Sequence, residues 1–383
     1  MTEGPLTGYR ILEIGHMLSG PYCGMLLSDM GAEVIKIEMP PDGDIARGLG
    51  SEEIDGFGVY FSSLNRGKKS ICLDIATDEG RHHLEALVAE ADGLITNLRP
   101  SAIRKLRLTY EDLRDIKPEF ACLALTGFGL EGPNADRPAY DYAVQAMIGL
   151  MRLTGDPGTP PTKTGYSVVD NSTGIMAAFA LVSMLLGGRG GQADVSLYDT
   201  MMSQMNYLAG DFLNTGNPPR RNASGGHPFI VPAQLFATSD GHLTLFISHD
   251  QFWARFARGV GREEWIDDPV FSTAKARTAN RETVVKALEA LFRTETTAHW
   301  VALLEPLGIV IAAVASLEEA LGSDLARDRE LVVDIPLETA SMRLLGLPFR
   351  VEGLAPAFAR PPRLGEHNDF LDRLPTAATR KVR

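Results

Sequence analysis

Tyr9-Arg-Ile-Leu-Glu-Ile-Gly15 and Glu33-Val-Ile-Lys-Ile-Glu38 are two short apolar runs that stand on either side of a helical run from Pro21 to Met30. Gly31 follows this helical run at the position where a glycine commonly ends a helix. The order is strand, helix, strand, and both strands are nearly continuous in apolar residues. This pattern predicts parallel strands that are buried on both faces.

The same alternation continues to about residue 215. We predict further strands at residues 70–75, 93–97, 121–126 and 193–198. We predict further helices at residues 78–91, 101–106, 110–116 and 142–151, a long apolar helix that begins near Asp170, and a helical run over residues 200–214. The repeated order of strands and helices predicts an α/β fold whose mostly parallel sheet is covered by helices on both faces.

The pattern changes after residue 215. Residues 216–229 are rich in Gly, Pro and Asn, which predicts a linker or loop. Two alternating apolar runs then surround Asp240-Gly241, which predicts a β-hairpin over residues 233–247, and helices are predicted at 251–260, 281–292 and 298–307. We therefore expect a large domain over residues 1–215, a smaller α+β domain over residues 230–325, and a C-terminal return to the large domain over residues 326–383.

The charge of the chain limits its partners. Its formal net charge is -12 and its pI is near 5.2. A general attraction to nucleic acid or to an anionic membrane surface is not expected of such a protein. An anionic ligand would need a local basic pocket.

The cysteines and the apolar segments exclude further classes of protein. Cys23, Cys72 and Cys122 are odd in number and widely spaced, which argues against a disulfide framework and against a zinc site. The N-terminus lacks the features of a signal peptide. The most apolar run, Ile175 to Leu186, is too short to span a bilayer and predicts a buried helix. We expect a cytoplasmic protein with no membrane partner, no metal and no tightly bound cofactor.

The first turn between strand and helix, Gly15-His-Met-Leu-Ser-Gly20, does not have the form of a dinucleotide-binding turn. The G-x-G-x-x-G fingerprint needs a glycine where Met17 stands, so binding of NAD or FAD is not supported. The sequence also lacks the P-loop, the G-x-S-x-G elbow and the H-E-x-x-H zinc motif. His16 follows a strand, where ligands of such sheets gather, so it is either a ligand contact or a packed loop histidine.

Two basic clusters flank predicted strands, Asn65-Arg-Gly-Lys-Lys-Ser70 and the run from Asn97 to Arg107. Basic side chains between the carboxyl end of a strand and the start of a helix suit a ligand that bears phosphates. A solvated charged surface is the alternative interpretation of each cluster.

Asp170 is the carboxylate whose position in the sequence says most about function. It stands in Ser167-Val-Val-Asp-Asn-Ser-Thr-Gly174, directly at the start of the apolar helix. One interpretation is structural, because Asp, Asn and Ser are all good N-caps. The other is chemical. The helix dipole would keep such a carboxylate ionised, and a positioned carboxylate can attack an activated acyl group.

These motifs together resemble the class III CoA-transferase family, which includes formyl-CoA and carnitine CoA-transferases and, as a divergent branch, alpha-methylacyl-CoA racemase. The resemblance covers nearly the whole chain. It rests on Arg10 to Gly15 with Ser19-Gly-Pro21, Leu27 to Glu38, Asn65 to Ser70, Asn97-Leu-Arg-Pro100, Thr126-Gly-Phe-Gly129, Pro138-Ala-Tyr-Asp141, Val169-Asp170 with Gly174, and Leu364-Gly-Glu-His367.

The resemblance implies a Rossmann-like large domain, an inserted smaller domain and an interlocked homodimer. It implies that the aspartate matched by Asp170 attacks an acyl-CoA thioester and forms a mixed anhydride. Returning CoA would then give an aspartyl-CoA thioester, from which an acceptor acid takes the CoA. An anhydride hydrolyses, so the site must be dry, and members of the family shield it with a glycine-rich loop. Gly225, Gly226 and His227 lie where that loop is expected.

The resemblance also implies the residues that contact CoA. The positions matched in this chain are His16, Met17, Lys36, Lys69, Asn97, Arg99 and Lys105. Lys105 stands where formyl-CoA transferases carry an arginine, and Met17-Leu18 stands where they carry a polar residue. These departures put formyl-CoA and oxalate in doubt as substrates.

One position separates transfer from racemisation. The racemase branch carries a histidine at the position of Tyr140, and that histidine exchanges the alpha proton together with the Asp170-like carboxylate. Tyrosine is a poor general base at neutral pH, so the transferase interpretation is favoured. Acyl-CoA racemase or isomerase activity is the alternative, and a non-catalytic CoA-binding protein is the third possibility.

Overall fold

The computed structural model describes residues 4–50, 52–352 and 357–374, and it divides the chain into two compact units. Unit 1 comprises residues 1–148, 166–206 and 324–383, and unit 2 comprises residues 149–165 and 207–323. The predicted division put residues 149–165 in the large domain, whereas the structure groups them with the inserted unit.

Unit 1 is built on a sheet of six parallel strands with the order β5-β2-β1-β6-β7-β8. The strands are β1 (Arg10–Ile14), β2 (Glu33–Glu38), β5 (Lys69–Cys72), β6 (Gly93–Thr96), β7 (Ala121–Thr126) and β8 (Gly191–Ser196). In chain order this is 3-2-1-4-5-6, the order of doubly wound nucleotide-binding folds. The predicted α/β class and parallel sheet are therefore confirmed.

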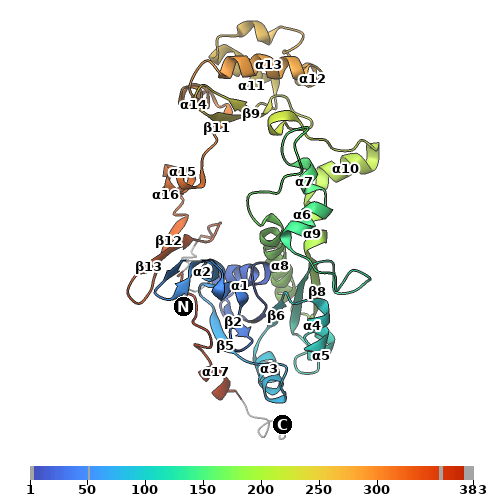
Figure 1. Cartoon of the computed structure of the whole chain (residues 1–383), viewed down its shortest axis with the longest axis vertical. Coiled ribbons are helices and arrows are strands. Elements are labelled where there is room, and N and C mark those ends of the chain that lie inside the picture. Colours follow the sequence, from blue (N-terminus) through green and yellow to red (C-terminus); the bar gives the residue numbers. More distant parts are fainter. Residues whose placement is uncertain (1–3, 51, 353–356, 375–383) are drawn as a thin grey trace. The chain divides into compact units, whose positions relative to one another are not determined.

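The helices of unit 1 lie on both faces of this sheet (Figure 1). The main ones are α1 (Ser19–Asp29), α2 (Val59–Asn65), α3 (Asp78–Glu90), α4 (Pro100–Lys105), α5 (Tyr110–Leu113), α6 (Asp141–Met147), α8 (Val168–Gly187) and α9 (Leu197–Gln204). Shorter elements are η1 (Ile45–Gly48), β3 (Glu53–Ile54), β4 (Phe57–Gly58), α16 (Asp324–Asp328), β12 (Val332–Pro336), β13 (Ser341–Leu345) and α17 (Asp369–Asp372).

Successive strand residues point to opposite faces of the sheet and so fill two cores. Ile11 and Leu123 pack with α1 and α8 on one face. Their neighbours Leu12 and Cys122 pack with α3, α4 and α5 on the other face. Both faces are covered, which explains why these strands are apolar without a polar alternation.

The C-terminal segment returns to unit 1 beside β5. The backbone N–H of His367 donates to the Ser70 carbonyl (2.9 Å), and the Ser70 N–H donates to His367 Nδ1 (3.2 Å). The Asn368 side chain accepts from the Cys72 N–H (2.8 Å). The Leu364–His367 motif therefore closes the edge of the parallel sheet. Residues 375–383, which include the end of the predicted return, lie outside the described residues.

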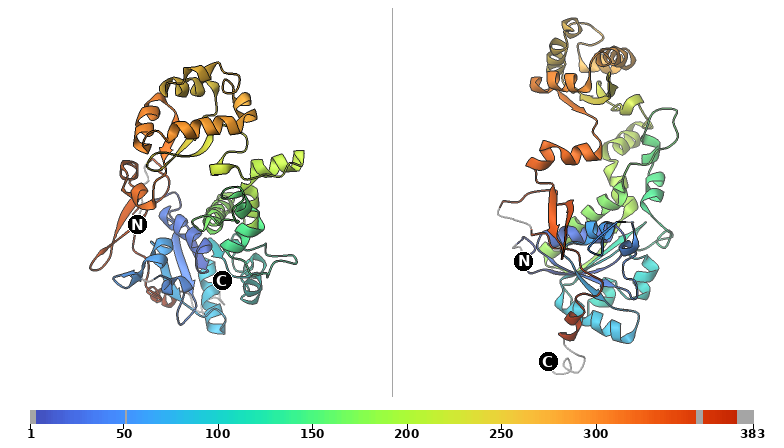
Figure 2. Two further views of the ribbon diagram at one scale, coloured as in Figure 1. Left: turned by 45° about the horizontal axis from the view of Figure 1, so that its top comes forward. Right: turned by 60° about the vertical axis from the view of Figure 1, so that its left-hand side comes forward.

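Unit 2 contains a three-stranded antiparallel sheet with the order β11-β10-β9. Its elements are α7 (Leu150–Leu153), α10 (Asn206–Thr215, whose first residue belongs to unit 1), η2 (Ala223–Gly225), β9 (Ala233–Ala237), β10 (His242–Phe246), α11 (Asp250–Gly259), η3 (Glu263–Ile266), α12 (Ala274–Ala279), α13 (Arg281–Phe292), α14 (Thr297–Leu304), η4 (Glu305–Leu307), β11 (Val310–Ala313) and α15 (Leu317–Gly322). Figure 2 gives two further views of these elements.

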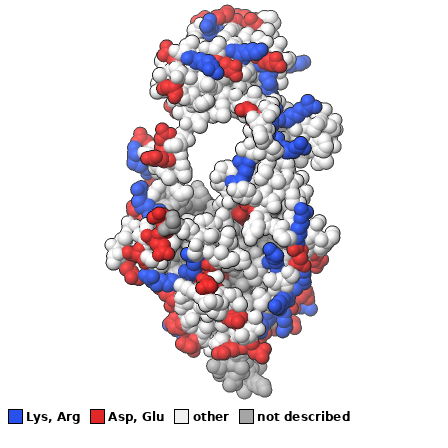
Figure 3. Space-filling view, in the orientation of Figure 1, with Lys and Arg blue, Asp and Glu red and all other residues white. Residues whose placement is uncertain are grey.

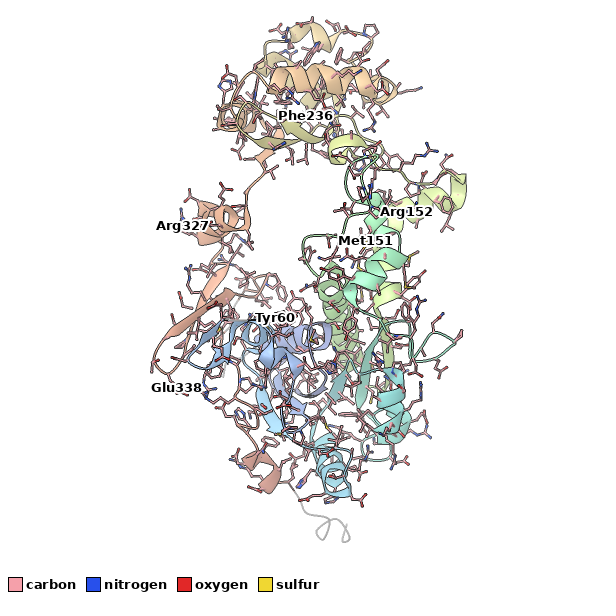
Figure 4. The ribbon with its side chains drawn as sticks, in the orientation of Figure 1. Tyr60, Met151, Arg152, Phe236, Arg327 and Glu338 are labelled. Atoms are coloured by element: carbon pink, nitrogen blue, oxygen red, sulfur yellow. The ribbon has the colours of Figure 1, made fainter. Side chains whose placement is uncertain are left out.

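An aromatic core holds unit 2 together. Phe236 of β9, labelled in Figure 4, packs against Phe292 of α13 with ring centroids 5.1 Å apart, and Phe292 meets Trp300 edge-on. The predicted hairpin is confirmed, with Ala237 opposite His242 and the predicted turn between them.

Three predicted elements differ from the observed ones. The helix expected over 142–151 is broken at Gly149, whose φ of 84° is left-handed, so α6 and α7 are separate. The helical run over 200–214 is likewise divided between α9 and α10 at Met205. The strand expected over 193–198 ends at Ser196, because the Ser196 hydroxyl accepts from the Asp199 N–H and starts α9.

The apolar helix α8 differs from its prediction in burial. It begins at Val168, close to the predicted start, and extends the apolar run of residues 175–186 to a helix of 20 residues. Among the described residues it is the helix whose length and composition would allow it to cross a membrane. It is also only partly buried. Val169, Thr173, Ala177 and Leu181 pack into unit 1, whereas other apolar residues on α8 are exposed, and Phe179 is 69% exposed.

Candidate active site

A cavity of about 550 Å³ opens in unit 1 at the carboxyl ends of β1, β6 and β7. The chain leaves β1 toward β2 and leaves β6 toward β7, so the two connections diverge and a crevice forms between them. Such switch points are where ligands of doubly wound sheets bind. The segments that follow these three strands, the start of α6 and the start of α8 all contribute to its wall.

His16 and Asn97 join the two sides of this crevice. The His16 N–H donates to Asn97 Oδ1 (3.0 Å), and Asn97 Nδ2 donates to the His16 carbonyl (2.8 Å). A Cβ at Gly20 would lie 2.9 Å from Asn97 Cγ, so the glycine makes room for the amide. The structure therefore brings these two predicted residues together at the cavity. Their two hydrogen bonds join the segment after β1 to the segment after β6.

Met17 forms the next part of the wall in a left-handed conformation with φ 68°. Such a conformation is uncommon for a residue with a side chain, and it persists only where its surroundings hold it. The Met17 N–H donates to Asp44 Oδ1 (3.0 Å). Asp44 is itself paired with Lys36 Nζ (2.9 Å), so a buried ion pair supports this turn.

Lys36 does not line the cavity but holds Asp44, which binds the backbone of Met17 in the cavity wall. Its ammonium is fully buried and contacts Glu13 Oε1 (2.7 Å), Asp44 and the Gly15 carbonyl (2.9 Å). Burial opposes its charge, but Glu13 and Asp44 outweigh that effect and raise the pKa of Lys36. Lys68 reaches Glu13 Oε2 (2.7 Å) from the other side. Breaking such a buried pair typically costs about 3–5 kcal/mol.

The other two predicted lysines also lie outside the cavity wall. Lys69 is paired with Glu33 at the amino ends of β5 and β2, the sheet edge opposite to the cavity. Lys105 is exposed in the last turn of α4. Figure 3 shows Lys and Arg side chains gathered over the α4–α5 part of unit 1. Contact of these lysines with CoA stays a prediction, while Arg99 does line the cavity at the start of α4.

Asp170 lies in the first turn of α8 and faces the cavity. It is not the N-cap, which is Ser167, and the Ser167 side chain makes no capping bond. The cap is instead supplied by Asp141, whose Oδ2 accepts from the backbone N–H groups of Val169 (2.8 Å) and Asp170 (3.4 Å). The capping interpretation of Asp170 is therefore wrong, and its carboxylate is not occupied by its own helix.

The surroundings of Asp170 raise its pKa to about 6. Burial is the largest cause, the charge of Asp141 adds to it, and a hydrogen bond from the Ser19 hydroxyl acts in the opposite direction. Asp141 occupies the positive end of the helix, so the helix dipole does not keep the pKa of Asp170 low. The result is a carboxylate that is ionised at neutral pH yet more basic than usual, which suits a nucleophile.

Tyrosines and an arginine complete the site. Tyr140, 66% exposed, and Tyr60 both line the cavity. Burial first, and then the charges of Asp170 and Asp44, raise the pKa of Tyr60, which is labelled on α2 in Figure 4. The Arg137 guanidinium lies over the Phe128 ring, 5.4 Å from its centroid, and Arg137 lines the cavity as Arg99 does.

Four of these residues were not singled out from the sequence as site residues: Ser19, Tyr60, Arg137 and Asp141. Ser19 and Asp141 stand within motifs on which the family resemblance rests, so that resemblance was the available signal. Tyr60 and Arg137 offered none, because neither follows a strand of the sheet directly.

The predicted loop residues lie in unit 2. Gly225 has a left-handed φ of 67°, and a Cβ at Gly226 would lie 3.0 Å from Asn222 Cβ, so both positions favour glycine. The His227 ring stacks on Tyr207 with centroids 6.3 Å apart. Arg221 donates to the carbonyls of residues 151, 152, 156, 159 and 160, which ties the start of this loop to the 149–165 segment.

Comparisons with known proteins agree with this geometry. The model of CoA-transferase family III matches residues 6–368. The chain is 34% identical over 376 residues to succinate–glutarate CoA-transferase of Agrobacterium fabrum, covering 95% of this chain and 94% of that protein. It is 33% identical over 369 residues to succinyl-CoA:glutarate CoA-transferase of Mus musculus, covering 95% and 84% respectively.

Solved structures agree as well. A CaiB/BaiF family protein from Brucella suis has a TM-score of 0.84 and 32% identity, covering 97% of this chain and 99% of that one. A hypothetical protein from Mycobacterium tuberculosis has a TM-score of 0.85 and 28% identity, covering 97% and 100%.

The chain therefore belongs to CoA-transferase family III. It is an enzyme of the acyl-CoA:carboxylate CoA-transferase type, as the motifs predicted. Among the described residues, no three His, Cys, Asp or Glu side chains gather in a way that could hold a metal ion.

The raised pKa of Asp170 predicts how stability depends on pH. Asp170 has a pKa of about 6 in the folded chain, against the ordinary value of 3.8. The folded protein therefore holds this proton more tightly than the unfolded chain does. The free energy of unfolding should fall as the pH rises through about 6. Asp170→Asn is expected to melt at a higher temperature than the wild type at about pH 8, and its advantage should shrink by about 1 kcal/mol by about pH 5.

This is measured by thermal unfolding of both proteins across that pH range. Asp42→Asn, a change at an exposed aspartate, is the control and should track the wild type at every pH. An advantage of Asp170→Asn that stays constant with pH would contradict the raised pKa.

Proposed function

We propose that this enzyme moves CoA from an acyl-CoA donor to a carboxylic acid acceptor through covalent intermediates on Asp170. The observation that carries the proposal is the state of the Asp170 carboxylate. It faces the cavity at the switch point of the sheet, its helix is capped by another residue, and its pKa of about 6 leaves it ionised and basic.

In the proposed reaction, one Asp170 oxygen attacks the thioester carbon, the C–S bond breaks, and CoA leaves as a thiolate. The product is a mixed anhydride of Asp170 and the donor acid. The thiolate then attacks the Asp170 carbonyl carbon, which gives an aspartyl-CoA thioester and releases the donor acid. The acceptor acid enters and the same steps run in reverse. CoA is a substrate and product here, with no other cofactor.

The site offers fixed groups for this chemistry. Arg99 and Arg137 place positive charge at the cavity, which suits the phosphates of CoA or the carboxylate of an acid. Tyr140 stands where a racemase would need a stronger base, so transfer is favoured over alpha-proton exchange. The loop with Gly225, Gly226 and His227 is proposed to keep water from the anhydride.

The acids are proposed to be dicarboxylates. Two of the relatives named above carry succinate and glutarate in their names, and a relative from Haloarcula hispanica, 31% identical, is a succinyl-CoA:mesaconate CoA-transferase. A second carboxylate on the substrate would find a guanidinium partner at Arg99 or Arg137 in the same cavity.

A homodimer is proposed because α8 exposes apolar residues in the single chain. Ile175, Met176 and Phe179 lie on the side of α8 turned away from the sheet, and Leu186 follows near its end. Exposed apolar patches of this kind mark protein interfaces. A second copy of the chain, interlocked with the first, is the proposed cover. A cytoplasmic location stays a prediction.

The covalent route is tested by intact-protein mass spectrometry after mixing with succinyl-CoA, glutaryl-CoA and other acyl-CoAs. The wild type should gain a CoA-sized adduct, and Asp170→Ala should gain none, since it lacks the attacking oxygen. Asp78→Ala, which removes a first-turn carboxylate from α3, is the control and should behave as the wild type. An adduct on Asp170→Ala, or full transferase activity of that variant, would exclude Asp170 as the nucleophile.

Alpha-proton exchange is tested separately in deuterium oxide with 2-methylacyl-CoA. We expect no deuterium at the alpha carbon, since no strong base faces Asp170 at the position of Tyr140. Deuterium incorporation without CoA exchange, followed by mass spectrometry of the recovered thioester, would favour the racemase alternative over transfer.

The dimer is tested with Phe179→Glu, which places a charge on the exposed face of α8. We expect sedimentation to show a shift from dimer toward monomer, because a charge buried in the interface lacks a partner. Phe179→Leu keeps the surface apolar and should remain dimeric. A wild type that sediments as a monomer would contradict the proposed dimer.

A further inference from the structure

Two polar side chains stand on the buried face of α6, the helix beside α8 in unit 1 (Figure 1). Four buried residues of this region recur at the spacing of one helix face: Asp141, Val144, Gln145 and Ile148. Asp141 is 4% exposed and Gln145 is fully buried. A face of this kind is normally apolar, because a buried polar group costs free energy unless it is hydrogen-bonded. Both polar side chains therefore need partners inside the protein.

Gln145 binds Asp141, one turn earlier on the same helix. Its Nε2 donates to Asp141 Oδ1 at 2.6 Å. An ionised carboxylate only accepts hydrogen bonds, so the amide presents its N–H side to it. A bond between an amide and a charged oxygen belongs to the stronger class of hydrogen bonds. Asp141 lines the cavity, whereas Gln145 lies behind it and does not.

The second oxygen of Asp141 reaches the start of α8. Oδ2 accepts from the backbone N–H groups of Val169 (2.8 Å) and Asp170 (3.4 Å). The two oxygens thus have different partners, a side chain of α6 on one and the backbone of α8 on the other. The terminal torsion of an aspartate is broad, so a donor on Oδ1 is what fixes the direction of Oδ2. Gln145 therefore holds Asp141 in the orientation that binds α8.

We infer that Gln145 is a positioning residue for the Asp170 nucleophile and acts on it through the Asp141 carboxylate. This role rests on the proposed covalent function of Asp170. The contacts run from a buried amide on α6, through both oxygens of Asp141, to the backbone N–H of the residue that attacks. They fix the first turn of α8 and with it the place of the Asp170 carboxylate at the cavity.

The proposed reaction needs this carboxyl group to be aligned twice. In the first step an Asp170 oxygen bonds to the thioester carbon while the C–S bond breaks. In the second step the Asp170 carbonyl carbon bonds to the thiolate sulfur while its bond to the bridging oxygen breaks. One backbone position has to serve both attacks, and the rate of each depends steeply on the alignment of the reacting atoms.

The charge of Asp141 gives its orientation a second consequence. Burial is the largest cause of the raised pKa of Asp170, and the charge of Asp141 adds to it. A carboxylate held in place by Gln145 keeps this charge beside the nucleophile.

The role of Gln145 is tested by the rate of adduct formation in Gln145→Met, followed by rapid-quench mass spectrometry with an acyl-CoA that labels the wild type. Methionine is similar in length and has no donor. We expect the maximal rate to fall at least about tenfold, because small misplacements of a reacting group are costly. The acyl-CoA concentration that gives half of this rate should stay within about twofold of the wild-type value, since Gln145 does not line the cavity.

Val144→Ala is the matched control. Val144 is fully buried on the same face of α6 and does not line the cavity. This variant should lose stability through lost packing but keep the Gln145–Asp141 bond and the wild-type rate. Gln145→Asn keeps an amide on a shorter side chain that does not reach Asp141. Its rate should fall as that of Gln145→Met does, and it provides the measurement if Gln145→Met does not fold.

A double-variant cycle with Asp141→Ala tests the route. Asp141→Ala should itself be slow, because the start of α8 loses its cap. Adding Gln145→Met to this variant should change the rate by less than about twofold, since two residues that act through one contact are not additive. A further loss of about tenfold in the double variant would show that Gln145 acts by another route and would overturn the inference.

The remaining outcomes separate the two proposals. A wild type that gains its adduct at Asp170 while Gln145→Met and Gln145→Asn react at the same rate would overturn the role of Gln145 alone. A Val144→Ala variant that is slowed as much as Gln145→Met would overturn it as well, because lost packing would then explain both. A wild type that gains no adduct, or gains it elsewhere, would overturn the proposed function itself. A slow Gln145→Met beside an unchanged Val144→Ala supports the inference.

Discussion

The cavity edge of unit 1 depends on one buried lysine. Lys36 lies in the middle of a parallel strand with no exposure to solvent, and its charge is balanced by Glu13 and Asp44. Asp44 in turn holds the Met17 N–H in its left-handed turn, directly at the cavity. Since buried charges are tolerated only when each has its partners, the shape of the cavity wall is coupled to the interior of the sheet.

The sequence predicted the architecture because the strands are buried on both faces. The strand over residues 121–126 and the helix over 281–292 are found with the predicted bounds, and the hairpin around Asp240-Gly241 is present. The breaks at Gly149 and Met205 escaped prediction, since helical patterns continue across both. The exposure of α8 escaped prediction too, because an apolar run does not tell how much of a helix its own chain covers.

The site was predictable only where a motif marked it. His16 and Asn97 follow strands of the sheet, Asp170 lies in the first turn of a helix, and all three line the cavity. Lys36 and Lys69 show the limit of this reasoning, because a lysine in a strand can pair with a carboxylate from another element. The cap supplied by Asp141 comes from 28 residues upstream of Val169, a contact that exists only in the folded chain. Because of this contact, Asp170 does not cap its own helix and is available for chemistry.

Because Asp141 caps α8, the Asp170 carboxylate is left out of the hydrogen bonds that start its own helix. In the proposed reaction, the bridging oxygen departs with each acid that leaves and is replaced by an oxygen of the next acid that arrives. The enzyme would thus carry in its own side chain an isotopic trace of the last acid that it handled.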